Sequence, residues 1–185
     1  TETWREMVKL KESGKAKHIG VSNFTTKKLG WLIDEDEKPS NNQVELHPYL
    51  RQDKLLEFCK ENGIVVTAYS PLGCPALPTF MPNVVSEDSP ILLKDSVINE
   101  IALKHKSTPA QVLLKWGIDR GTPVLVKSSS EARMAENLDA VKLELSAEDI
   151  STINRIQTKC RYISFKMFCT SGHTVDQFWD GEYYN

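Results

Sequence analysis

Apolar residues along the chain alternate between short β-branched runs and longer segments with helical spacing. The short runs predict four strands, at residues 16–22, 42–46, 64–70 and 122–127. The third run is almost continuously apolar, which suits a strand that is buried on both faces of a parallel sheet. Because helical segments follow the strands, the pattern predicts repeated βα units of an α/β protein.

The helical segments carry recognisable start signals. Thr108 is a natural N-cap before Pro109 at the first helical position, and Ser146 precedes an apolar face at Ile150 and Ile153. Helices are predicted at the beginning of the chain, where Trp4, Met7, Val8 and Lys11 have helical spacing, and at residues 25–34, 53–62, 94–105, 109–120, 130–138 and 146–156. The first of these begins at once after Thr1, as expected of a chain whose upstream part is missing.

Four βα units are too few for an eight-stranded barrel, which typically needs about 250 residues. The sequence therefore indicates either half of a barrel or a small open α/β domain. An open dinucleotide-binding sheet would carry a glycine-rich turn after its first strand, and the segment GVSNF at 20–24 has no such turn. Residues 72–90 form a long proline-containing loop, which is typical of a lid or binding loop. The expected division is a unit at 1–158 and a tail at 159–185.

Composition narrows the class of partner. The chain of 185 residues has a formal net charge of −2, and no basic stripe collects on one helix, so nucleic-acid and membrane-surface roles have little support. The four cysteines have no C-x-x-C spacing and do not combine with the histidines into a metal pattern. There is neither a signal sequence pattern nor an apolar run of membrane length. A cytoplasmic protein with a small-molecule partner and no metal is expected.

Polar residues stand where the predicted strands end, which is where ligands meet parallel α/β folds. Ser22, Asn23 and Gln43 could hold a neutral carboxamide, and Tyr69 offers a flat ring for a planar group. After the fourth strand, Lys127 and three serines precede a helix with Arg133 in its first turn. Cations and backbone N–H groups at a helix start favour a phosphate.

The segments GVSNF, NQVELHPYL, TAYSPLG and VKSSSEARMAEN occur in an order and spacing that resemble the aldo-keto reductases, specifically the aldose and aldehyde reductase branch, from about Thr3 to Ile156. This resemblance implies a (β/α)8 TIM barrel of which the chain is the C-terminal half, with strands five to eight. It also implies NADP(H) as the cofactor and a monomeric parent enzyme that reduces aldehydes or ketones.

The same resemblance implies a cofactor-binding role for individual residues. Ser22, Asn23 and Gln43 would bind the nicotinamide carboxamide, Tyr69 would stack on the nicotinamide ring, Ser70 and Leu72 would cover the pyrophosphate, Lys127, Ser128, Ser129 and Arg133 would hold the 2′-phosphate, and Glu136 and Asn137 would reach the adenine. Phe80 would supply the loop aromatic for substrate packing. The chain departs from the family pattern at Val126, Ala76 and Cys160.

No catalytic residue can be assigned in this chain. In the family a Tyr proton donor, tuned by Lys and Asp, works beside a His, and all four belong to the first half of the barrel. Two alternatives to an enzyme half therefore stay open: a non-enzymatic NADP-binding relative and an inactive fragment.

Several conspicuous side chains have structural interpretations. We expect His47 to be structural beside Pro48, His18 to be packed in the first strand, and His105 and His173 to lie at the surface. The tail aromatics Phe165, Phe168, Phe178 and Trp179 fit a loose apolar cover and a substrate-pocket wall equally well.

Overall fold

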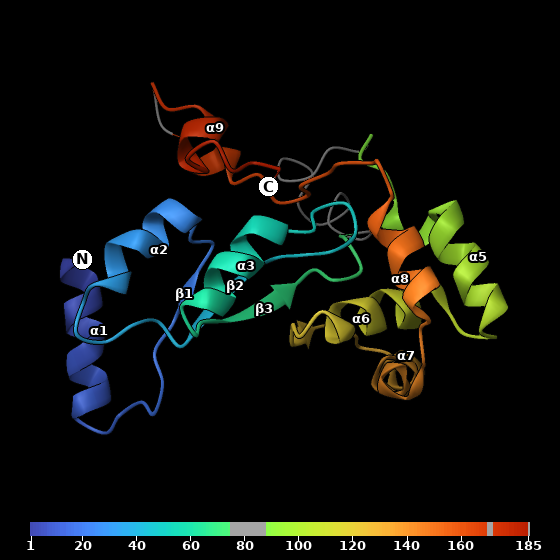
Figure 1. Cartoon of the computed structure of the whole chain (residues 1–185), viewed down its shortest axis with the longest axis horizontal. Helices are drawn as coiled ribbons and strands as arrows, with labels where there is room; N and C mark the ends of the chain where they lie inside the picture. The colour runs from blue at the N-terminus through green and yellow to red at the C-terminus, as the bar shows by residue number, and fades with distance from the viewer. Residues whose placement is uncertain (75–87, 170–171, 185) are drawn as a thin grey trace.

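Four parallel strands form the centre of the fold, and they follow one another across the sheet in chain order. The computed structural model describes residues 1–74, 88–169 and 172–184 (Figure 1). The strands are β1 (Val21–Ser22), β2 (Asn41–Glu45), β3 (Val65–Tyr69) and β4 (Val124–Leu125). A doubly wound sheet reverses its strand order at a switch point, whereas a barrel wall does not. The order β1-β2-β3-β4 is therefore that of a barrel wall, as predicted for a barrel half.

One face of this sheet gathers residues from all four strands. The register pairs Ser22 with Gln43, and it places Tyr69 between Glu45 and Leu125. Paired residues in parallel strands share a face, which is the face that a closed barrel turns inward. Leu125 on this face is 49% exposed, so the face is only partly covered in this chain.

Helices lie beside the sheet and extend away from it (Figure 1). The α-helices are α1 (Glu2–Glu12), α2 (Thr26–Ile33), α3 (Asp53–Glu61), α5 (Ser96–Lys104), α6 (Pro109–Asp119), α7 (Glu131–Asp139), α8 (Ala147–Asn154) and α9 (Val175–Phe178), and the 3-10 turns are η1 (Leu92–Lys94), η2 (Ala140–Lys142) and η3 (Lys166–Phe168). Thr108 and Ser146 cap α6 and α8 through complete capping boxes. These predicted helix starts are confirmed.

Two predicted strands are shorter in the structure. The first was expected at 16–22 and the fourth at 122–127, but their ladders cover only Val21–Ser22 and Val124–Leu125. Both are edge strands that pair on one side among the described residues, so fewer ladder bonds define them. His18 lies outside β1 and is exposed, so the expectation of a packed His18 in a strand was wrong.

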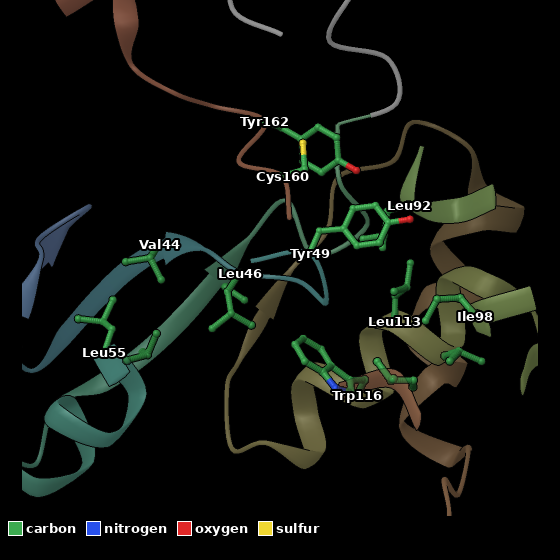
Figure 2. Packing of buried hydrophobic residues seen from close by; sticks show 14 of the residues in the cluster. Val44, Leu46, Tyr49, Leu55, Leu92, Ile98, Leu113, Trp116, Cys160 and Tyr162 are labelled. Carbon is green, nitrogen blue, oxygen red and sulfur yellow. The ribbon is translucent and has the colours of Figure 1, made fainter. Parts of the chain in front are cut away.

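The main core joins the sheet to α3, α5, α6 and α8. Leu46 from the end of β2 and Leu55 from α3 belong to the same buried cluster as Leu113 and Trp116 from α6 (Figure 2). The Trp116 indole Nε1 donates to Asn154 Oδ1 at 2.9 Å, which satisfies its one polar atom. A smaller cluster of Trp4, Ile19 and Leu32 packs α1 against α2. Among the described residues, no helix is long and apolar enough to cross a membrane.

Asp149 fastens α8 to α5. Its carboxylate accepts hydrogen bonds from Lys104 Nζ at 2.7 Å, His105 Nε2 at 2.8 Å and Ser146 Oγ at 2.7 Å. His105 is therefore half-buried and hydrogen-bonded to Asp149, which corrects the expectation of a surface position. Burial alone would raise the pKa of Asp149, but the bonds from Lys104, Ser146 and His105 outweigh it and lower the pKa well below its usual range.

Replacing Asp149 with asparagine is expected to lower the free energy of unfolding by about 2 kcal/mol at pH 7, because the carboxylate loses its charge-assisted hydrogen bond from Lys104 and one of its two acceptor oxygens. A carboxyl with a lowered folded-state pKa stabilises the protein above its unfolded-state pKa, and this stabilisation disappears as pH falls through the folded-state value. The difference between the two proteins should therefore shrink below about pH 4. Urea denaturation at pH 7 and pH 3 measures it, and an equal difference at both values would contradict the assignment.

Candidate functional site

A cleft of about 750 Å³ lies between the segment after β3, the end of β4, the N-terminal part of α6 and one face of α7. Its volume is in the range typical of sites for small organic ligands. Eight of the predicted site residues line it: Ser70, Leu72, Lys127, Ser128, Ser129, Arg133, Glu136 and Asn137. The structure therefore brings together predicted site residues from two stretches, 70–72 and 127–137, that are far apart in the sequence.

One end of the cleft is suited to an anion. Ser130 caps α7 by accepting a hydrogen bond from the Arg133 backbone N–H at 3.4 Å, and the Ser130 N–H donates to Ser128 Oγ at 3.1 Å. Lys127 and Arg133 are exposed, and no ion pair engages either side chain among the described residues. Two unpaired cations beside a helix N-terminus favour a phosphate group.

A hydrogen-bonded link between α6 and α7 also borders the cleft. Thr108 Oγ1 donates to Glu136 Oε1 at 2.7 Å, and Gln111 Nε2 donates to the Glu136 carbonyl at 3.0 Å. The same Thr108 hydroxyl accepts from the Gln111 N–H as the cap of α6. The sequence predicted this cap but not its contact with Glu136, because the contact joins two helices.

A second group of predicted residues meets at the ends of β1, β2 and β3. The Tyr69 hydroxyl donates to Asn23 Oδ1 at 2.9 Å, Asn23 Nδ2 donates to Ser22 Oγ at 3.2 Å, and Ser22 Oγ donates to the Gln43 carbonyl at 2.8 Å. The Gln43 side chain makes no hydrogen bond within the described part of the chain, so its amide is free for a ligand. This group does not line the cleft, but Ser70, which follows Tyr69, does.

Tyr69 stays a neutral phenol over the ordinary pH range. Burial and the nearby Glu45 carboxylate raise its pKa, although the positive charge of Arg161 acts in the opposite direction. A neutral ring fixed by its hydroxyl to Asn23 presents a planar surface. This geometry suits stacking on an aromatic ligand.

Glu45 is a site-organising residue that the sequence interpretation missed. It is fully buried, and its carboxylate accepts from the Tyr162 N–H at 2.7 Å, the Ile163 N–H at 2.9 Å and His47 Nε2 at 2.9 Å. Burial acts to raise its pKa, but the contacts with His47 and the two backbone N–H groups prevail and lower it. The available signal was an acidic residue between Val44 and Leu46, at the end of β2. His47 is buried beside it, as expected of a structural histidine.

Phe80, predicted to contact substrate, lies outside the described residues, as does Ala76. Within the part of the chain that the structure describes, no group of three or more His, Cys, Asp and Glu side chains could hold a metal ion.

The chain matches the Aldo/keto reductase family over residues 1–158. It is 46% identical over 164 residues to "Aldo-keto reductase family 1 member C15" of Rattus norvegicus, covering 87% of this chain and 49% of that protein. It is 43% identical over 165 residues to "Prostaglandin-E(2) 9-reductase" of Oryctolagus cuniculus, covering 88% and 50%, and 40% identical over 182 residues to "Estradiol 17 beta-dehydrogenase 5" of Mus musculus, covering 97% and 54%.

This chain spans about half the length of the curated relatives it matches. The names of these three relatives refer to a family 1 C member, a prostaglandin and a steroid hormone, whereas the motifs were interpreted as those of the aldose and aldehyde reductase branch. The parallel sheet has the strand order of a barrel wall, and the family match covers residues 1–158. The chain therefore belongs to the aldo/keto reductase family.

Proposed function

We propose that this chain is the cofactor-binding half of an NADPH-dependent reductase that converts aldehydes or ketones to alcohols. The observation that carries the proposal is the cleft beside the capped N-terminus of α7, in which Lys127 and Arg133 have no ion-pair partner among residues 1–74, 88–169 and 172–184. A doubly charged phosphate would supply a partner for both cations. NADPH carries such a phosphate on its adenosine ribose, whereas NADH does not.

The residues present fit the cofactor. Lys127, Ser128, Ser129 and Arg133 would hold the 2′-phosphate, Glu136 and Asn137 would contact the adenine, Ser70 and Leu72 would cover the pyrophosphate, and Ser22, Asn23, Gln43 and Tyr69 would orient the nicotinamide. The free Gln43 amide complements a carboxamide, and the Tyr69 ring excludes water from one side of a planar group. When bound, NADPH supplies the hydride for carbonyl reduction.

We propose further that the chain corresponds to the C-terminal half of the barrel, with its tail from residue 159 on the substrate side. Its motif order matches strands five to eight of the family pattern, and the Tyr, Lys, Asp and His set would belong to the preceding half. The substrate would be a bulky apolar ketone rather than a sugar aldehyde. The names of the relatives and the aromatic tail support this revision of the expected branch.

Turnover by the parent protein tests this function. We expect it to oxidise NADPH only when an aldehyde or ketone is present, with the alcohol as product, as followed by cofactor absorbance and product analysis. A parent that binds NADPH without turnover would be a non-enzymatic relative, and a sequence before Thr1 that lacks the Tyr, Lys, Asp and His set would predict that outcome. Either result would overturn the proposed reaction.

A further inference from the structure

The C-terminal segment, which begins at residue 159, is attached to the sheet through residues near its own start. The Tyr162 and Ile163 N–H groups donate to the buried Glu45 carboxylate, and the buried Arg161 precedes them. The Tyr162 ring also packs against Gly73, where an added Cβ would come within 3.0 Å of a ring carbon. Gly73 has a φ of +71°, so this close approach combines with a backbone conformation that favours glycine. The first attachment is thus made at β2 and the segment after β3.

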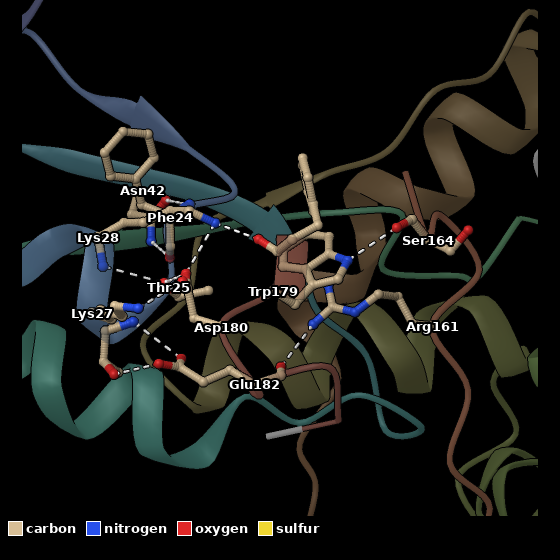
Figure 3. A network of polar contacts seen from close by, with 12 residues as sticks. Phe24, Thr25, Lys27, Lys28, Asn42, Arg161, Ser164, Trp179, Asp180 and Glu182 are labelled. Atoms are coloured by element: carbon tan, nitrogen blue, oxygen red, sulfur yellow. Dashed lines mark hydrogen bonds and ion pairs between the residues drawn. The ribbon is translucent and has the colours of Figure 1, made fainter. Parts of the chain in front are cut away.

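Two carboxylates attach the other end of the segment to the N-terminus of α2. Thr25 Oγ1 donates to Asp180 Oδ2 at 2.7 Å (Figure 3). Both the N–H and the hydroxyl of Thr26 donate to Glu182, the N–H at 3.0 Å. Acidic groups at a helix N-terminus interact favourably with its unsatisfied N–H groups and its dipole. Two residues more than 150 positions away in sequence therefore complete the start of α2.

Lysines of α2 strengthen this second attachment. Lys28 Nζ lies 3.0 Å from Asp180 Oδ2 and 5.0 Å from the centre of the Phe178 ring, and it also donates to the Phe178 carbonyl. Lys27 Nζ lies 3.4 Å from Asp180 Oδ1. The Asp180 side chain is only 9% exposed, so solvent screens these contacts less than it screens a surface ion pair.

Between the two attachments lies a group of four aromatic residues, which we name the aromatic segment: Phe165, Phe168, Phe178 and Trp179. The Phe165 ring stacks on Phe178 with centroids 5.9 Å apart, and Trp179 meets Phe178 edge-on at 5.3 Å. Trp179 is 2% exposed, with the Arg161 guanidinium 3.8 Å above its ring. Phe168 is 60% exposed, so the aromatic segment keeps one apolar surface open.

Both attachments adjoin the residues at the strand ends that the proposed function assigns to the nicotinamide. Thr25 follows Asn23 by two residues, and Glu45 follows Gln43 by two. Arg161 is near enough to influence the pKa of Tyr69. A segment fixed at these two points is held beside the strand ends, where the reacting carbonyl would meet the cofactor.

We propose that Asp180 and Glu182 are positioning residues that hold the aromatic segment beside Asn23 and Gln43, where it forms the apolar wall for the substrate. The attachment itself stands on the described contacts, and the role as substrate wall rests on the proposed function. This favours the pocket-wall interpretation of the tail aromatics over a loose cover. Removing the two charges should release the segment without disturbing the distant phosphate end of the cleft.

Tryptophan fluorescence of the 185-residue chain tests the attachment. The double variant Asp180→Asn and Glu182→Gln preserves side-chain size, and the emission of Trp179 is isolated by subtracting the spectrum of the same protein with Trp179→Phe. We expect a red shift and a rise of roughly threefold or more in acrylamide quenching of Trp179, because charge-assisted hydrogen bonds are lost. Asp176→Asn is the matched control, since Asp176 is an exposed acid of the neighbouring helix α9. The Trp179 emission of this control should be unchanged.

Cofactor binding and kinetics separate this inference from the proposed function. The double variant should bind NADPH within about twofold of the original chain, since the phosphate contacts lie elsewhere. In the parent enzyme, KM for a bulky apolar ketone should rise roughly tenfold while kcat and KM for a small aldehyde stay unchanged. An unchanged Trp179 signal would overturn the attachment, and an equal rise in both KM values would overturn the substrate wall. Failure of the original chain to bind NADPH would count against the proposed function instead.

Discussion

Replacing both Lys127 and Arg133 with alanine is expected to weaken NADPH binding by roughly a hundredfold, and to change NADH binding by less than about threefold. Each cation would donate charge-assisted hydrogen bonds to the 2′-phosphate, and such bonds are worth about 1.5–3 kcal/mol. Both side chains are exposed, so solvent and salt screen their charges, and each bond should contribute a free energy near the lower end of this range. Fluorescence titration of the 185-residue chain and of the variant with each cofactor measures the change.

Lys142→Ala paired with Arg155→Ala is a suitable control, because it removes the same number of positive charges from exposed positions outside the cleft. This control should shift NADPH affinity by less than about twofold at physiological salt. Equal losses in the two double variants would mean that general charge, and not a phosphate site at α7, attracts the cofactor. Equal losses of NADPH and NADH affinity would show that Lys127 and Arg133 do not recognise the 2′-phosphate.

Replacing Glu45 with alanine is expected to lower the free energy of unfolding by about 3–5 kcal/mol, because three buried donors lose their acceptor and each unsatisfied buried group costs about 1–3 kcal/mol. The change leaves His47 and the N–H groups of Tyr162 and Ile163 without their acceptor in a buried environment. The first attachment of the C-terminal segment is lost with it. Urea denaturation at pH 7 gives the difference in stability.

Glu57→Ala is the matched control for this substitution, since Glu57 is an exposed residue of the neighbouring α3 and should change stability by less than about 0.5 kcal/mol. Glu45→Gln keeps one acceptor oxygen and is expected to fall between the two. Because the pKa of Glu45 is lowered in the folded state, its contribution is complete above the usual carboxyl pKa and disappears as pH falls through the folded-state value. An alanine variant as stable as the Glu57 control would contradict the anchoring role.

Local signals in the sequence were sufficient for the helices up to α8 and for the caps of α6 and α8, but the short helix α9 (Val175–Phe178) in the tail was not predicted. Thr108 and Ser146 start helices because a hydroxyl and the residue three positions later satisfy the first N–H groups, which is decided within one turn. The strand ends could also be found, because apolar runs stop at Tyr69 and near Lys127. The length of β1 and β4 could not, because a ladder depends on the partner strand and not on the run itself.

Contacts between segments that are far apart in the sequence could not be predicted from the pattern of apolar and polar residues. Glu45 bonds to Tyr162 across 117 positions, and Asp180 reaches Thr25 across 155. No periodicity in the tail indicated where it would return to the sheet, so its aromatics could not be assigned to a wall or a cover. The pairing of His105 with Asp149 was missed for the same reason, since it depends on the packing of α5 against α8.

Calorimetric titration of the unmodified chain with NADPH and with NADH tests the central claim most directly. A cleft built around Lys127 and Arg133 predicts saturable one-to-one binding of NADPH that is at least about tenfold tighter than binding of NADH, and that weakens as salt is raised. Equal affinity for the two cofactors, or no saturable binding of NADPH by the folded chain, would contradict the claim that this chain carries the NADP(H) site.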